Sequence, residues 1–159
     1  HRDTRFSKDK SPYKTNVGLF FPFIGTNSTV GKAVERPGIY CHIEPGNCAI
    51  GGGIYMPTPD QLKAIRARIY NHHEEWDEIV HSRQFTTIFA TGIHGESLKT
   101  MPRGYEPNHT ASEYIRKKQW YVWETFDESV LFTEEIIDIL EEKSIASLAF
   151  HEFLSGENI

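Results

Sequence analysis

The stretch RFSKDKSPYKT, residues 5–15, concentrates positive charge in a chain that is acidic overall. Four of its residues are cations: Arg5, Lys8, Lys10 and Lys14. Arginine binds phosphate or carboxylate as a two-pronged donor and lysine as a flexible point charge, and a loop can bring several of them to one anion. Phe6, Pro12 and Tyr13 would hold such a loop in place. The stretch therefore predicts an anion-binding loop, and the alternative is a solvated loop with local ion pairs.

A second group is His42 and Glu44, which are two residues apart. Alternate residues of a strand share a face, so these side chains are expected side by side and next to Tyr40. A histidine beside a carboxylate can transfer a proton or orient a substrate. A metal would need a third ligand, such as His94 or His109, and the sequence has no H-E-x-x-H or C-x-x-C pattern. We expect a catalytic pair without metal or other cofactor; the alternative is a polar pair on the open face of a hairpin.

The third group is Arg103, in the loop PRGYEPNH (residues 102–109). This loop holds one cation and one titratable ring, that of His109, and its prolines make it rigid. Alone it would be a turn. Together with the basic stretch and with His42 and Glu44, it is expected to form the second wall of one pocket.

Three consecutive glycines, residues 51–53, lie inside a predicted strand. Glycine weakens a strand, and it allows another group to approach the backbone closely. No Lys-Ser or Lys-Thr pair follows, so this is not a phosphate-binding loop of the nucleotide-binding type. Packing against an aromatic ring or a bulge is the first interpretation, and a ligand lying over the glycines is the second.

The charge is unevenly distributed along the chain. Residues 1–16 hold five Lys or Arg and two Asp, a balance of +3, which leaves −8 for the rest of a chain whose net charge is −5. The acidic total argues against a general nucleic-acid binder. No apolar run approaches the roughly 18 residues of a membrane span, so no membrane is expected.

Cys41 and Cys48 are the two cysteines of the chain. Two are too few for a disulfide framework, which favours a reducing compartment, the cytoplasm, with the nucleus as the alternative. We expect free thiols on opposite faces of a hairpin, if the alternation of the strand runs through the turn.

Apolar runs with β-branched and aromatic residues predict strands at 17–24, 38–44, 49–56 and 119–125. The turn at 45–47 makes the second and third runs an antiparallel hairpin, and 25–37 is expected to be an exposed loop. Thr58, Pro59 and Gln61 start a long amphipathic helix to about Val80. Further helices are expected from Ser82 to Phe89, from about 108 to 118, and from Thr133 to Gly156. The whole chain, 1–159, is expected to be one α+β domain with strands first and helices later.

Three stretches occur in an order that resembles a known family: RDTRFSKDKSPYKTN (2–16), PGIYCHIEPGNCAIGGGIYMP (37–57) and PRGYEPNH (102–109). Together they are similar to domain-of-unknown-function family 2461, and the similarity covers nearly the whole chain. The family has no established activity, substrate or cofactor, so the resemblance implies none. It does imply a helical N-terminal segment that this chain lacks, and a last helix that is often longer and more basic than the acidic one here.

We expect the three groups to converge on a pocket that binds or turns over a ligand carrying phosphate or carboxylate. The cations would hold the anion, and His42 with Glu44 would orient or protonate the ligand. The alternative is an interaction module without chemistry, whose basic loop meets an acidic protein or nucleic acid. A structural domain without a pocket is the third interpretation. Whether the protein is an enzyme, and its oligomeric state, are left open.

Overall fold

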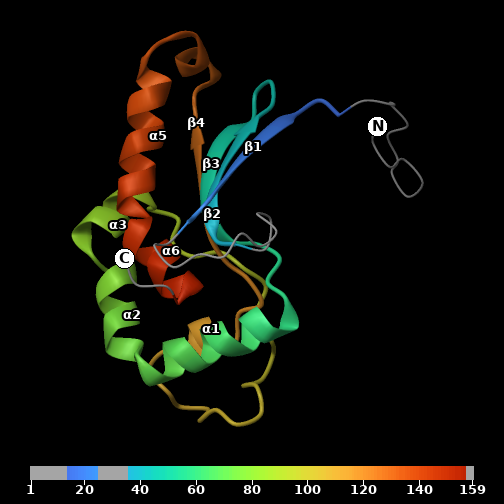
Figure 1. The fold of residues 1–159 in the computed structure, drawn as a ribbon, viewed down its shortest axis with the longest axis vertical. Helices are drawn as coiled ribbons and strands as arrows, with labels where there is room; N and C mark the ends of the chain where they lie inside the picture. Colours follow the sequence, from blue (N-terminus) through green and yellow to red (C-terminus); the bar gives the residue numbers. More distant parts are fainter. Residues whose placement is uncertain (1–13, 25–35, 157–159) are drawn as a thin grey trace.

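An antiparallel sheet of four strands forms the centre of the computed structural model, which describes residues 14–24 and 36–156. The strands lie in chain order: β1 (Val17–Pro22), β2 (Gly38–Ile43), β3 (Cys48–Ile54) and β4 (Trp120–Phe126). The predicted hairpin is β2–β3. Helices follow the hairpin along the chain, so the α+β class is confirmed (Figure 1).

The register of the strands decides which side chains share a face. Tyr40 of β2 pairs with Phe20 of β1 and with Gly51 of β3, and Gly51 pairs with Trp123 of β4. Because paired residues point to the same side of a sheet, these four positions form one row across it. We call the side that carries this row the open face.

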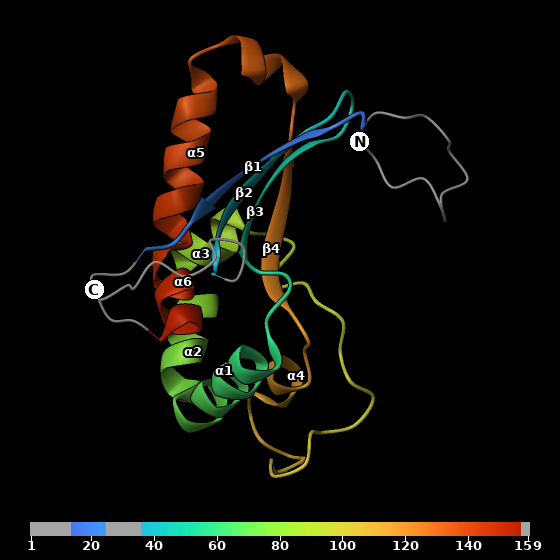
Figure 2. The ribbon, with the colours of Figure 1, turned by 45° about the vertical axis from the view of Figure 1, so that its right-hand side comes forward.

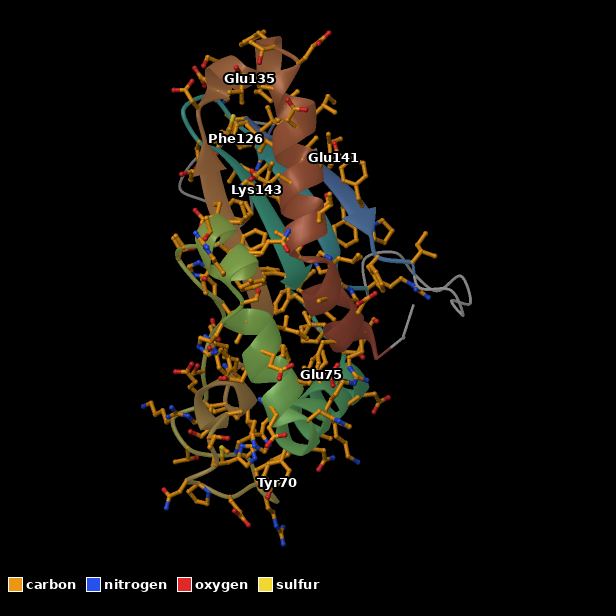
Figure 3. All side chains as sticks on the ribbon, turned by 90° about the vertical axis from the view of Figure 1, so that its left-hand side faces the viewer. Tyr70, Glu75, Phe126, Glu135, Glu141 and Lys143 are labelled. Carbon is orange, nitrogen blue, oxygen red and sulfur yellow. The ribbon has the colours of Figure 1, made fainter. Side chains whose placement is uncertain are left out.

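The other face of the sheet is buried beneath α5 (Glu135–Ala146) and α6 (Leu148–Ser155), which lie along it in Figure 2. Cys41 and Ile50 of this face pack with Ile139 and Leu140 of α5. In Figure 3, α5 lies in front of the strands, and Phe126 of β4 is labelled beside it. Among the described residues, the helices that pack on the sheet lie on this face.

The helix predicted from Pro59 to Val80 is two helices, α1 (Pro59–Asn71) and α2 (His73–Val80). Its start is confirmed: Thr58 and Gln61 form the predicted capping box. The break falls at His72, whose φ of −125° and ψ of 44° are not helical. Both helices place apolar side chains in the core: Ile65, Ile69, Trp76 and Val80.

The remaining helices keep the predicted order and differ in extent. Ser82 caps α3 (Arg83–Ile88) as predicted, whereas α4 (Ser112–Ile115) is shorter than the predicted 108–118. The final segment holds a 3-10 helix, η2 (Glu128–Phe132), followed by α5 and α6 with a break at Ser147. Gly156 ends α6 with a φ of 74°, the left-handed cap that the sequence predicts.

The main core lies where α1, α2, α3 and α6 meet the ends of β3 and β4. Its largest fully buried side chains are aromatic: Trp76, Trp120, Phe89 and Phe150. Among the described residues, no helix is both long and apolar enough to cross a membrane.

Cys41 and Cys48 are free and buried, so the prediction of two free thiols is confirmed. Their placement on opposite faces is wrong. Cys41 pairs with Ile50, and Cys48 is two residues from Ile50 on the same strand, so both thiols lie on the face beneath the helices. The register sends odd residues of β2 and even residues of β3 to one side, and the spacing in sequence does not reveal this. Burial, followed by the nearby Cys48, raises the pKa of the Cys41 thiol.

Candidate functional site

His42 and Glu44 contact each other at the end of β2, as the alternation of the strand predicts. His42 Nε2 lies 3.3 Å from Glu44 Oε2. The other ring nitrogen, Nδ1, lies 3.4 Å from the hydroxyl of Tyr40 and 3.4 Å from the side-chain amide of Asn16. Both nitrogens of a 9% exposed ring are thus within reach of polar groups, and the three side chains form a continuous line, Tyr40–His42–Glu44.

Glu44 also joins the hairpin to the end of the basic stretch. The hydroxyl of Thr15 donates a hydrogen bond of 2.6 Å to Glu44 Oε1, and the amide of Asn47 donates one of 3.1 Å to Oε2. These bonds, with that from His42, lower the pKa of Glu44 to about 2, the Thr15 bond being the largest cause. Glu44 is therefore a fixed anion at neutral pH, suited to orienting His42 and unsuited to acting as a general acid.

The convergence expected from the sequence holds in part. Thr15 and Asn16 bring the end of the stretch 2–16 to His42 and Glu44, and Lys14 is exposed beside them. Arg5, Lys8 and Lys10 lie outside the described residues.

Arg103 does not lie with His42 and Glu44. Its loop packs at the far end of the molecule, where the ring of Tyr105 lies 5.3 Å from that of Tyr70 in α1. Figure 3 places Tyr70 at the end opposite Phe126, the β4 residue that pairs with Cys48 at the start of the hairpin's second strand. The expectation that this loop forms the second wall of a pocket with His42 and Glu44 is therefore wrong. The aromatic side chains of the loop found partners on α1, which the sequence does not indicate.

The open face of the sheet holds a pocket of about 640 Å³, here called the open-face pocket. Glycines 51–53 of β3 are buried in the strand and belong to the lining of the pocket. Aromatic side chains line the rest, from β1, β2, β4 and the segment after β3: Phe20, Tyr40, Tyr55, Tyr121 and Trp123. The first interpretation of the glycines holds at Gly51, where a Cβ would lie only 2.8 Å from the Trp123 ring.

The rings of this pocket are held by one another. Tyr40 and Trp123 are stacked with ring centroids 6.1 Å apart, and Tyr55 meets Tyr121 edge-on at 5.2 Å. Trp123 also lies 5.8 Å from His42. Tyr40 and Trp123 therefore connect the pocket to the Tyr40–His42–Glu44 line, which stands behind one of its walls.

The charge of the pocket lining is positive or neutral. Arg36 and His94 line it, and none of the described lining residues is acidic. Burial is the first of the causes that raise the pKa of Tyr121, so its hydroxyl stays neutral and can donate a hydrogen bond. Such a lining suits a molecule with an apolar ring and an anionic group.

The sequence analysis did not single out Arg36 or Tyr121, and it considered His94 only as a third metal ligand; all three line the pocket. A signal for part of the site was present: Tyr121 and Trp123 alternate in a predicted strand, and the glycines allowed a ligand over them. Trp120 belongs to the core, and Trp123 lines the pocket.

Comparison with known proteins agrees with the resemblance described above. No curated protein matches the chain, and no solved structure does. A family model described as "Conserved hypothetical protein (DUF2461)" matches residues 1–153. The chain belongs to this family.

Proposed function

We propose that the protein binds a small anionic molecule with a flat ring in the open-face pocket. The observation that carries this proposal is the lining: aromatic rings around a floor of three glycines, with Arg36 and His94 and no acid among the described lining residues. A planar ring in the pocket can stack on Trp123 or Tyr40. A carboxylate or phosphate on that ring would meet the positive charge of Arg36.

His42 and Glu44 act on this site through Tyr40. Glu44, held ionised by Thr15, Asn47 and His42, fixes the imidazole, and the imidazole lies 3.4 Å from the Tyr40 hydroxyl. The role that we propose for them is to position the Tyr40 wall of the pocket. Arg103 takes no part, because its loop lies at the other end of the molecule.

The three tryptophans of the chain allow a test with an internal control. Trp123 lines the open-face pocket, while Trp76 and Trp120 are buried in the core. Titration with naphthalene-2-carboxylate, followed by the indole N–H signals in a ¹H–¹⁵N NMR spectrum, should shift Trp123 and leave the other two in place. Naphthalene-2-methanol lacks the charge and cyclohexanecarboxylate lacks the flat ring, so each should bind about tenfold more weakly, the loss expected for one charge-assisted or stacking contact.

A matched pair of variants distinguishes a direct contact with the ligand from the overall electrostatic field of the protein. Arg36→Gln should weaken binding of naphthalene-2-carboxylate, whereas Arg83→Gln, the same charge change at an exposed position of α3, should not. An unchanged Trp123 signal at millimolar concentrations of all three compounds would overturn the proposal. Equal affinity for the acid and the alcohol would overturn its anionic part.

A further inference from the structure

His94 stands at the edge of the open-face pocket in a fixed position. Its backbone pairs with Tyr121 as an isolated bridge beside β4, with His94 N–H donating to the Tyr121 carbonyl at 2.7 Å. Its ring stacks on the ring of Tyr121, with centroids 5.6 Å apart and planes 29° apart. Both contacts hold the imidazole against the pocket wall that it lines.

The Nε2 atom of His94 meets a threonine hydroxyl that is already surrounded by acceptors. Thr91 Oγ1 lies 3.0 Å from His94 Nε2, 2.9 Å from Glu124 Oε1 and 3.1 Å from the Trp123 carbonyl oxygen. The Thr91 backbone N–H also donates to Glu124 Oε1, at 3.1 Å. Glu124 is thus held against Thr91 by two contacts.

The proton count at Thr91 decides the tautomer of His94. A hydroxyl has one proton to donate, and a carboxylate and a carbonyl can only accept. If Thr91 gave its proton to His94, its oxygen would face both acceptors, at 2.9 and 3.1 Å, without a hydrogen between them. The arrangement without this repulsion has Thr91 donating to Glu124 or to the Trp123 carbonyl, and His94 Nε2–H donating to Thr91.

In the neutral ring, this tautomer leaves the lone pair of His94 on Nδ1. No hydrogen bond reaches Nδ1 from any part of the chain that the structure describes. The ring is half-buried and His94 lines the pocket, and its Nδ1 is a hydrogen-bond acceptor without a partner among the described residues.

We infer that His94 is a specificity-determining residue, whose Nδ1 accepts a hydrogen bond from an O–H or N–H group of the ligand. Thr91 and Glu124 are positioning residues that fix its tautomer. The inference rests on the proposed function and narrows it: the ligand carries a hydrogen-bond donor on its ring in addition to the anionic group. A site built to accept from such a donor rejects the analogue that lacks it, because the acceptor is then left without a partner.

The first experiment needs no ligand. Long-range ¹H–¹⁵N NMR spectra of the neutral imidazole at alkaline pH distinguish the two tautomers by the ¹⁵N shifts of the ring. We expect His94 to carry its proton on Nε2 in the wild type. Thr91→Val removes the acceptor of that proton and should mix the two tautomers, whereas Thr86→Val, a threonine on exposed α3, should change nothing. A proton on Nδ1 in the wild type would overturn the inference.

The second experiment uses ligand probes: the isomeric hydroxynaphthalene-2-carboxylates and their methyl ethers, titrated as above. At least one hydroxy acid should bind about tenfold more tightly than its ether, a difference typical of one buried hydrogen bond. His94→Phe keeps a ring on Tyr121 and should abolish this difference, measured in the variant as the ratio of the affinities of each hydroxy acid and its ether. A preference that survives in His94→Phe, or no preference for any isomer, would overturn the inference. Loss of naphthalene-2-carboxylate binding itself in the wild type would instead overturn the proposed function, and the tautomer measurement would still stand.

Discussion

The indole of Trp123 occupies the space that a side chain on Gly51 would fill. A Cβ at Gly51 would lie 2.8 Å from the Trp123 ring and 2.9 Å from the Val122 carbonyl oxygen. The two residues are partners across β3 and β4, so glycine on one strand is what allows the aromatic wall on the other.

Gly51→Ala should therefore destabilise the fold, by about 1–3 kcal/mol, because the new methyl group must displace either the indole or the strand. Denaturant unfolding measures this loss. In a Trp123→Leu background the same substitution should cost less, since the ring is gone, and this double-mutant cycle isolates the contact. An equal cost in both backgrounds would show that Trp123 is not what excludes a side chain at Gly51.

Glu44 should make stability depend on pH in the acid range. Its folded pKa of about 2 is below the unfolded value near 4.3, so its hydrogen bonds stabilise the protein fully above the unfolded value and are lost as the pH falls toward 2. The difference in unfolding free energy between wild type and Glu44→Gln should shrink over that interval. The control is Glu141→Gln, the same substitution at a glutamate of α5 (Figure 3). Thr15→Val should narrow the pH interval over which stability changes, because it removes the hydrogen bond that lowers the pKa of Glu44 most. An unchanged dependence of stability on pH in Thr15→Val would contradict this role of Thr15.

His151 should make the unfolding free energy depend on pH in a separate range, higher than that of Glu44. It is 3% exposed, and burial lowers its pKa to about 4. Its Nε2 has no hydrogen-bond partner within the described ranges. Between the unfolded pKa of about 6.5 and 4 the unfolded chain binds more protons, so stability should fall as the pH is lowered through this window, by about 3 kcal/mol at most.

The variant His151→Leu removes this titration and fills a similar volume. Its unfolding free energy should change less than that of the wild type between pH 6.5 and 4, as measured by denaturant unfolding at fixed ionic strength. Parallel curves for the two proteins would show that His151 is not the group responsible.

Arg68 of α1 should stabilise the end of α6. Its Nη1 donates to the carbonyl oxygens of Phe153 and Leu154, at 2.6 and 3.2 Å, and these carbonyls belong to the last turn of the helix. Arg68→Leu should cost about 1–3 kcal/mol of unfolding free energy, because it leaves both without this donor. Arg68→Lys keeps the charge and loses the fork, so it should recover only part of the loss. Full recovery by lysine would show that the planar guanidinium is not needed.

How much the sequence predicts depends on how local each feature is. The contact of His42 with Glu44 follows from strand alternation, and the start of α1 follows from three adjacent residues, Thr58, Pro59 and Gln61. Both are confirmed. The break at His72 depends on how two helices meet one core, so periodicity along the chain continues through it.

The features that sequence reasoning missed are set by pairing between distant segments. The faces of Cys41 and Cys48 depend on the register of β2 and β3, and the place of Arg103 depends on the contact of Tyr105 with Tyr70. The open-face pocket needs β1, β2, β3 and β4 in register and the His94 segment beside β4. One sequence predicts the strands, and it does not fix which residues of different strands become neighbours.

The pairing of β3 with β4 has a consequence for folding order. Ile54 and Trp120 are partners, although α1, α2, α3 and α4 lie between them in the chain. The β2–β3 hairpin closes over a turn of a few residues, whereas β4 can join only after the entropy of this long loop has been lost. The glycine floor can thus form with the hairpin. The wall of Tyr121 and Trp123 forms only when β4 pairs with β3, and these are the paired strands farthest apart in sequence. A substitution that weakens β4 should slow the formation of the pocket more than that of the hairpin.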